Sequence, residues 1–422
     1  MAGIELSAGM EGLRLLGQER LAGESPVALT REEANLAHAY HAGFPMYRAT
    51  PLRSLGELAR RLRVGAILVK DESGRFGLNA FKVLGASYAV GRWVAQSLGI
   101  RRDRLSYALL TSPDTLRRLG DLTLVTASDG NHGRGVAWTA ARLKLRSVVY
   151  LPRGSAPAVL QNIAREGAQV LVADGNYDEA VHLAAEHARK LGCLLVQDTA
   201  WDGYEEILGF IMQGYLTLAR ELEDQLAGPG QAPTHVFLQA GVGTLAAGLA
   251  GYYQGLPGNA GSPLVTVVEP AAVNCFYRSA AAGARTCVTG DYASIMAGLA
   301  CGAPSTTAYR ILRQAADCFL SIPDQLAAYG MRVLGNPLGE DPRVISGESG
   351  AACLGAVASI LSNPALGDFR EALKITPQSR LLFISTEGDT NPGRYRDIVW
   401  GGAWPLTDGD IAGSHAREGD QG

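Results

Sequence analysis

The chain has 422 residues, of which 47% are apolar and 19% charged, and a formal net charge of -3. This composition is typical of a soluble globular protein with more than one domain, and the acidic balance excludes the basic surface of a nucleic-acid-binding protein. No run of about 18 apolar residues and no cationic leader occurs, so we expect neither a membrane span nor a secretory signal. We therefore expect a cytoplasmic protein.

The six cysteines are scattered and include no Cys-x-x-Cys pair, so no metal site is predicted. Cys275 and Cys301 bracket one segment and would pair if their Cα atoms met. In a cytosolic chain free thiols are the usual state, and the sequence leaves the pairing open.

A helix is predicted from Thr30 to Tyr40, because Thr30 and Glu33 form a capping box. From Gly65 onward, short apolar strands alternate with helices of 10 to 15 residues. The predicted strands are 67–69, 122–126, 147–151, 169–172, 193–196, 234–238, 264–268 and 380–385. Such alternation predicts an α/β fold with parallel sheets covered on both faces. We expect two doubly wound domains, a large one of residues 1–87 and 201–422 and a small one of residues 88–200 inserted in it.

Lys82 stands out in the stretch from Ser73 to Tyr88. It follows a buried strand and begins a helix in which Phe81, Leu84 and Tyr88 recur at helical spacing. Desolvation there would lower the pKa of the lysine and make it nucleophilic. The alternative is that the stem packs and the charged end reaches water.

Two glycine-rich loops each follow a predicted strand and begin a helix. The loop 128–133 (SDGNHG) presents backbone N–H groups suited to a substrate carboxylate, unless it is simply a turn. The loop 240–248 (AGVGTLAAG) predicts a phosphate cradle with the Thr244 hydroxyl as an extra donor. Its glycine spacing differs from that of dinucleotide-binding loops.

Two further strand ends carry polar residues. Asp198 closes a strand that has no other charge, which suits a catalytic carboxylate or a helix cap. Residues 385–390 (STEGDT) carry a pair of hydroxyls that could bond a ring nitrogen or turn the chain. A lysine, two anion-binding loops and this hydroxyl pair together indicate pyridoxal 5′-phosphate chemistry.

Five motifs carry a family resemblance: 75–82 (RFGLNAFK), 128–138 (SDGNHGRGVAW), 197–201 (QDTAW), 295–302 (IMAGLACG) and 385–390. Over residues 30–405 the chain resembles the fold-type II, tryptophan-synthase-β-like pyridoxal-phosphate enzymes, and within them the 2,3-diaminopropionate ammonia-lyase family. Ser128 stands where threonine is more usual in that family, and Asn391 where aspartate is.

The resemblance implies a site in the cleft between two domains and a homodimer. Lys82 would hold the cofactor as a Schiff base beside Phe81, and Asn131 would contact the phenolic O3′. Thr386 would face the pyridine nitrogen, and Glu348 belongs to a segment that lines the ring. The remaining implied contacts are Gly241, Val242, Gly243 and Thr244 for the phosphate, and Ser128, Asp129, Gly130, Asn131 and His132 for the substrate.

The implied reaction is α,β-elimination of D- or L-2,3-diaminopropionate to pyruvate and two ammonia through aminoacrylate. Lys82 would act as the base on one face of the cofactor, and Asp129 or Asp198 on the other. Three alternatives stay open: a serine/threonine dehydratase, a β-replacement enzyme, and a nucleotide-binding or cofactor-binding module without turnover.

Overall fold

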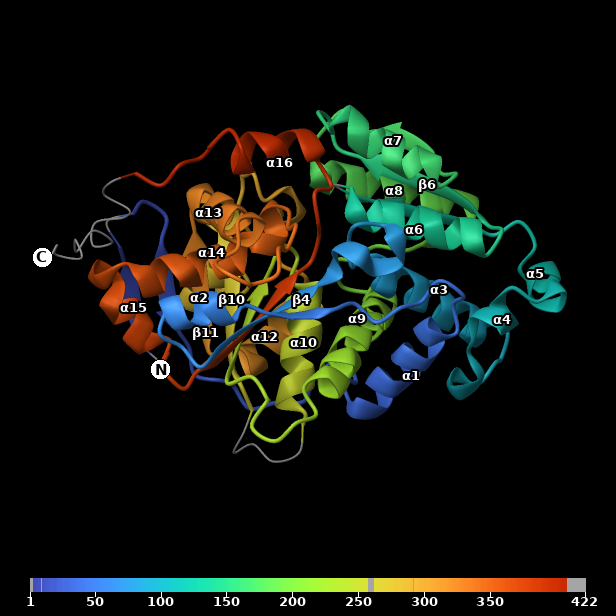
Figure 1. Cartoon of the computed structure of the whole chain (residues 1–422). Coiled ribbons are helices and arrows are strands. Elements are labelled where there is room, and N and C mark those ends of the chain that lie inside the picture. Colours follow the sequence, from blue (N-terminus) through green and yellow to red (C-terminus); the bar gives the residue numbers. More distant parts are fainter. Residues whose placement is uncertain (1–2, 9, 129, 257–261, 291, 408–422) are drawn as a thin grey trace, which may run out of the picture.

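Two β-sheets form the framework of the computed structural model, which describes residues 3–8, 10–128, 130–256, 262–290 and 292–407. The larger sheet has the strand order β1-β2-β11-β10-β9-β12-β4-β3, and the smaller has the order β7-β6-β5-β8. Helices surround both sheets, and the group of α6, α7 and α8 lies beside the larger sheet (Figure 1). The predicted α/β class with parallel sheets is confirmed.

The strands of the larger sheet are β1 (Glu5–Ser7), β2 (Arg14–Gly17), β3 (Leu52–Ser54), β4 (Ala66–Asp71), β9 (His235–Gln239), β10 (Leu264–Pro270), β11 (Cys318–Ile322) and β12 (Arg380–Ser385). Those of the smaller sheet are β5 (Thr123–Ala127), β6 (Arg146–Leu151), β7 (Gln169–Val172) and β8 (Leu194–Leu195). The helices are α1 (Arg31–Ala42), α2 (Gly56–Arg61), α3 (Val83–Ser97), α4 (Tyr107–Leu110), α5 (Pro113–Leu119), α6 (Asn131–Arg142), α7 (Pro157–Arg165), α8 (Tyr177–Leu191), α9 (Glu206–Gln225), α10 (Thr244–Gln254), α11 (Cys275–Ala282), α12 (Thr306–Ala315), α13 (Asp324–Gly335), α14 (Glu348–Ser362), α15 (Gly367–Ala372) and α16 (Pro392–Val399).

The sequence-based prediction omitted four strands of the larger sheet. β2 and β3 pair antiparallel with β11 and β4, and β1 pairs antiparallel with β2. These three strands have only three or four residues, so their extended form depends on the partner strand and not on local periodicity. β11 was omitted as well. The predicted domain limits stay a prediction, and the limit at residue 88 falls within α3.

The larger sheet separates two hydrophobic layers. In β9, Val236 and Leu238 belong to the layer of α1, α3, α9 and α10, whereas Phe237 belongs to the layer of α13 and α14. Successive strand residues point to opposite faces, so a fully apolar strand supplies both layers. This burial explains why the inner strands other than β11 were recognisable as continuous apolar runs.

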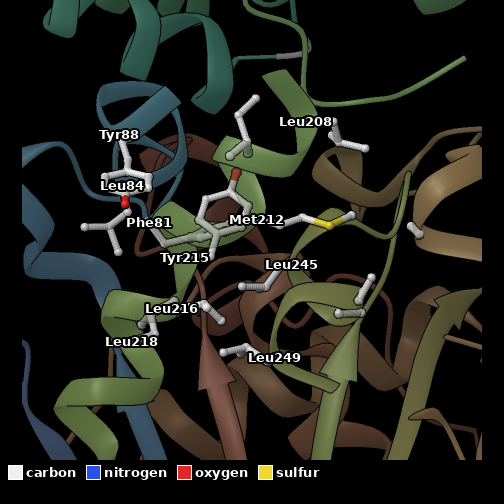
Figure 2. Packing of buried hydrophobic residues seen from close by; sticks show 14 of the residues in the cluster. Phe81, Leu84, Tyr88, Leu208, Met212, Tyr215, Leu216, Leu218, Leu245 and Leu249 are labelled. Atoms are coloured by element: carbon white, nitrogen blue, oxygen red, sulfur yellow. The ribbon is translucent and has the colours of Figure 1, made fainter. Parts of the chain in front are cut away.

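Close packing of α3 against α9 determines where Lys82 lies. A Cβ atom at Gly85 would come within 2.6 Å of Ile211, and one at Gly214 within 2.5 Å of the Leu84 carbonyl oxygen. Phe81 and Leu84 of this region meet Tyr215 of α9 in the same layer (Figure 2). The two glycines therefore allow the helices to approach closely, and the start of α3 is held against α9.

A buried charge cluster supports the loop that precedes Lys82. The Arg75 guanidinium donates to Glu221 at 2.7 and 2.9 Å and to Glu72 at 2.8 Å, and Lys70 Nζ donates to Glu221 at 2.6 Å. The four side chains are at most 1% exposed. Two cations and two anions with matched hydrogen bonds compensate one another, whereas loss of one partner would leave a buried charge unpaired.

The described cysteines form no disulfide. The Cys275 thiol donates to Glu269 Oε1 at 3.6 Å and to the Cys301 carbonyl oxygen at 3.8 Å, so the disulfide between Cys275 and Cys301 that the sequence left open is not formed.

Within the described ranges no group of three or more His, Cys, Asp or Glu residues could hold a metal ion. In the same ranges no single helix is long and apolar enough to cross a membrane, while the residues of α14 and 364–372 meet the length and composition test only as a pair bent by 104°.

His41 links α1, α3 and α9. Its Nδ1 lies 2.7 Å from Thr217 Oγ1, and its Nε2 lies 3.1 Å from Ser87 Oγ and 3.2 Å from the Leu84 carbonyl oxygen. Burial lowers the pKa of His41 to about 3, with Arg75 acting in the same direction. The imidazole is therefore neutral in the folded protein at physiological pH.

His41→Gln should weaken the acid sensitivity of folding. The folded pKa is below the unfolded one, so the stability that neutral His41 contributes is complete above about pH 6.5 and is lost as the pH falls toward 3. Between pH 7 and pH 5 this loss is about 2 kcal/mol in the parent protein. Urea denaturation at both pH values measures it. The exposed His182→Gln serves as control, and an equal loss in parent and His41→Gln would contradict the prediction.

Candidate active site

The carboxyl ends of strands from both sheets meet at one pocket. Its lining includes Phe81, Lys82, Asn131, Asp198, Gly241, Val242, Gly243, Thr244 and Thr386, all named from the sequence. Lys82 follows β4, Asn131 begins α6 after β5, and Asp198 follows β8. Parallel strands place their carboxyl ends on one edge of a sheet, and ligands of open α/β sheets bind there.

Lys82 and Asp198 contact each other in this pocket. Lys82 Nζ donates to Asp198 Oδ2, and the two side chains are 17% and 5% exposed. Tyr177 OH donates to the other carboxylate oxygen at 3.4 Å. Burial acts to raise the pKa of Asp198, but His132 and Lys82 together lower it to about 2. Asp198 is thus an anion at neutral pH, next to the Lys82 side chain that lines this pocket.

His132 lies behind this pair and not among the residues that line the pocket. Its Nε2 lies 2.7 Å from the Val196 carbonyl oxygen, so Nε2 carries the proton that this acceptor requires. Nδ1 lies 3.8 Å from Asp198 Oδ2 and has no hydrogen-bond partner within the described residues. Burial lowers the pKa of His132, which favours the neutral imidazole.

The loop between β9 and α10 forms an anion-binding cradle. Within the described residues, no protein acceptor receives the backbone N–H groups of Gly241, Val242, Gly243 and Thr244. Four amides at the start of an 11-residue helix provide both donors and a positive helix end. The Thr244 hydroxyl, expected to be an extra donor, donates to the Asp198 carbonyl oxygen at 2.5 Å and so ties the cradle to the smaller sheet.

The loop 128–133 is organised by Ser128. Its Oγ accepts from the N–H groups of Gly130 and Gly133, each at 2.9 Å, and the residue is buried. Ser128 therefore caps the start of α6 and is absent from the pocket lining. Gly130 lines a neighbouring cavity. Asp129, predicted to be catalytic, lies outside the described residues.

The neighbouring cavity has a volume of about 530 Å³ and shares Asn131, Tyr177, Gly298, Cys301 and Glu387 with the first pocket. Glu348 lies in this second cavity, with its carboxylate 3.8 Å from Arg394 Nε. Burial raises the pKa of Glu348. The structure thus places Glu348 beside the pocket that holds Lys82 and not in its lining.

Sequence reasoning missed several residues of the pocket. Gln239 Nε2 donates to Thr386 Oγ1 at 3.0 Å, and Tyr177, Ser349 and Glu387 also line the pocket. Gln239 carried a usable signal, because it is the polar last residue of the buried strand β9. Ser349 directly follows Glu348, in the segment that the resemblance places at the ring. Tyr177 begins α8, and no local pattern points to it.

The family of pyridoxal-phosphate dependent enzymes matches residues 44–387 of the chain. The protein therefore belongs to this family, and its cofactor is pyridoxal 5′-phosphate. Similarity to known proteins also defines the subfamily. The chain is 48% identical over 383 residues to a diaminopropionate ammonia-lyase of Salmonella typhimurium, a match that covers 89% of this chain and 94% of that protein. It belongs to the diaminopropionate ammonia-lyases.

Solved structures agree with this assignment. The diaminopropionate ammonia lyase from Escherichia coli, in complex with an aminoacrylate-PLP azomethine reaction intermediate, has a TM-score of 0.86 and 43% identity, and the match covers 93% of this chain and 98% of that one. The same enzyme in complex with D-serine also has a TM-score of 0.86, with 42% identity and coverage of 94% and 98%.

The pocket residues fit this cofactor. The four N–H groups of residues 241–244 suit its phosphate, and Lys82 suits its aldehyde. Thr386 Oγ1 accepts from Gln239, so its own proton is available for a ring nitrogen. The donor set therefore provides a phosphate site, a nucleophilic amine and a neutral hydroxyl in one pocket.

Gly243→Ala should weaken cofactor binding by about tenfold or more. The added methyl group would displace the loop, so that the four amides of residues 241–244 could no longer converge on the phosphate. Gly243 has φ +91°, and a Cβ atom there would lie 2.3 Å from the Phe276 ring. Titration of the apoprotein with pyridoxal phosphate measures the affinity. The matched control is Gly248→Ala in the same helix, where the nearest atom is 3.4 Å away. Equal affinities in the two variants would contradict the phosphate assignment.

Proposed function

We propose that the protein converts 2,3-diaminopropionate and water to pyruvate and two ammonia, through β-elimination and release of aminoacrylate. The observation that carries this proposal is the contact between Lys82 and Asp198 beside the anion cradle. The similarity to diaminopropionate ammonia-lyases over nearly the whole chain supports the substrate. Water hydrolyses the released aminoacrylate to pyruvate and the second ammonia.

Pyridoxal phosphate supplies an electrophilic aldehyde and an electron-accepting ring, which together make the Cα proton of a bound amino acid acidic. Lys82 holds the aldehyde, and residues 241–244 hold the phosphate. Once the substrate amine has taken the place of Lys82, the neutral Lys82 amine is positioned to remove the Cα proton from one face. Asp198, an anion beside Lys82, stabilises the ammonium that forms.

Asp129 or Asp198 supplies the remaining proton transfers in this proposal. A carboxylate on the face opposite Lys82 removes the Cα proton of the other enantiomer, which accounts for use of both D and L substrates. The leaving β-amine needs a proton to depart as ammonia, and a carboxyl group near Cβ is a suitable donor. Asp129 follows the buried Ser128 directly in the loop 128–133.

The Thr386 hydroxyl favours elimination over transamination. A carboxylate at the ring nitrogen would keep that nitrogen protonated, whereas a neutral hydroxyl leaves it unprotonated and weakens electron withdrawal. Gln239 orients Thr386 by donating to its Oγ1. We assign this role to Thr386 because it lines the pocket at the end of β12.

Elimination from serine is the second candidate reaction, since the similar Escherichia coli enzyme has been crystallised in complex with D-serine. A serine dehydratase would expel hydroxide, for which a cation-binding carboxylate offers no advantage. We therefore propose that the protein prefers diaminopropionate to serine. The β-replacement reaction differs from both eliminations in requiring an added nucleophile.

The homodimer, the cytoplasmic location and the domain limits at residues 88 and 200 remain predictions. The same applies to the substrate contacts assigned to Ser128, Gly130, Asn131 and His132, and to Glu348 as a residue near the ring.

Lys82→Ala should abolish the absorbance band of the Schiff base between Lys82 and the cofactor and reduce pyruvate formation by at least about 100-fold, because the nucleophilic amine is removed. The exposed Lys190→Ala is the control and should behave like the parent protein. Absorbance scans and pyruvate detection with diaminopropionate measure both properties. Retained elimination in Lys82→Ala would sink the assignment.

Asp129→Asn and Asp198→Asn should slow the two enantiomers unequally. The enantiomer whose Cα proton the residue handles should lose about 100-fold in kcat, since general base catalysis contributes that much. Pyruvate formation from D- and L-diaminopropionate measures the ratio, with the exposed Asp202→Asn as control. Equal losses for both enantiomers in both variants would rule out bases on opposite faces.

A further inference from the structure

Glu387 contacts Asn131 across the boundary between the two sheets. Asn131 Nδ2 donates to Glu387 Oε2 at 2.5 Å. Asn131 begins α6, which follows β5 of the smaller sheet, whereas Glu387 follows β12 of the larger one. Both residues line the pocket that contains Lys82.

The Glu387 carboxylate is itself held in place. Its Oε1 accepts from the Ser349 N–H at 3.3 Å, in the first turn of the 15-residue helix α14. A Cβ atom at Gly347 would lie 3.0 Å from Glu387 Cγ and Oε1, so a glycine at this position allows the carboxylate to lie this close to the start of α14. Glu387 is 6% exposed. The carboxylate thus bridges the amino-terminal ends of α14 and α6, which both favour a negative charge.

This contact determines which way the Asn131 amide faces. A carboxylate only accepts hydrogen bonds, so Glu387 requires the NH₂ end of the amide and repels its oxygen. The second N–H of Nδ2 then remains for an oxygen acceptor in the pocket. Without the carboxylate, the amide can rotate by half a turn and present its carbonyl oxygen, which would repel a phenolic oxygen.

We propose that Glu387 is a positioning residue, which orients the Asn131 amide so that it donates to the phenolic oxygen of the cofactor. The proposal rests on the cofactor contact assigned to Asn131 above and goes beyond it. Glu387 acts through Asn131 and takes no proton from the substrate.

The test compares Glu387→Gln, Asn131→Ala and the double variant. The single Gln oxygen cannot serve both Ser349 and Asn131, so the affinity of the apoprotein for pyridoxal phosphate should fall by about tenfold or more. The absorbance maximum of the bound cofactor should also shift. In the double variant both properties should equal those of Asn131→Ala alone, because the proposed effect of Glu387 passes through Asn131. Glu387→Asp keeps the charge but withdraws it from Asn131, so it should resemble Glu387→Gln and serves if that variant does not fold.

Asp389→Asn is the matched control. Asp389 lies two residues further along the same loop and accepts from the Asn79 amide at 3.1 Å, so this variant weakens the same kind of contact without touching Asn131. Its cofactor affinity and absorbance should match those of the parent protein.

Unchanged affinity and absorbance in both Glu387 variants would overturn the proposal. Additive losses in the double variant would overturn it too, since they would show that Glu387 acts independently of Asn131. Unchanged properties in Asn131→Ala would remove the proposal together with the contact assigned to Asn131. The elimination chemistry is tested separately by Lys82→Ala. A negative result for Glu387 or Asn131 would therefore leave the proposed reaction unaffected.

Discussion

The contact between Lys82 and Asp198 joins the two sheets at the pocket, and the surrounding structure serves to maintain it. Lys82 precedes α3, which Gly85 and Gly214 hold against α9. Asp198 follows β8, and its carbonyl oxygen accepts from Thr244 in the anion cradle. A lysine and a carboxylate from separate sheets can share a pocket only when both sheets present their carboxyl edges to each other.

The charges near the pocket are divided between support and chemistry. Arg75, Glu72, Glu221 and Lys70 form a compensated cluster under the loop before Lys82, with every charge paired. Lys82 and Asp198 are also paired but line the pocket, where a ligand can reach them. The buried cluster therefore fixes the conformation of the loop before Lys82. Lys82 and Asp198, which a ligand can reach, are available to react with it.

Much of the site was predictable because strand ends followed by glycine-rich loops carry a local signal. Lys82, Asn131, Asp198, Thr386 and the cradle 241–244 all line one pocket, as their positions after apolar strands indicated. The substrate contact assigned to Ser128 stays a prediction, and in the structure its Oγ accepts from two amides of its own loop. Local sequence cannot distinguish a hydroxyl that caps a helix from one that binds a ligand.

By itself, the sequence determined the α/β class, the inner parallel strands other than β11 and the loops that bear the chemistry, since apolar periodicity and glycine placement are local properties. Only the tertiary structure decided the short edge strands, the placement of Glu348 beside the pocket and the link between Glu387 and Asn131. Those features join segments far apart in the chain: Glu387 lies 256 positions from Asn131, and β2 pairs with β11. Their energies come from contacts formed when the sheets pack together, which no local pattern in the chain encodes.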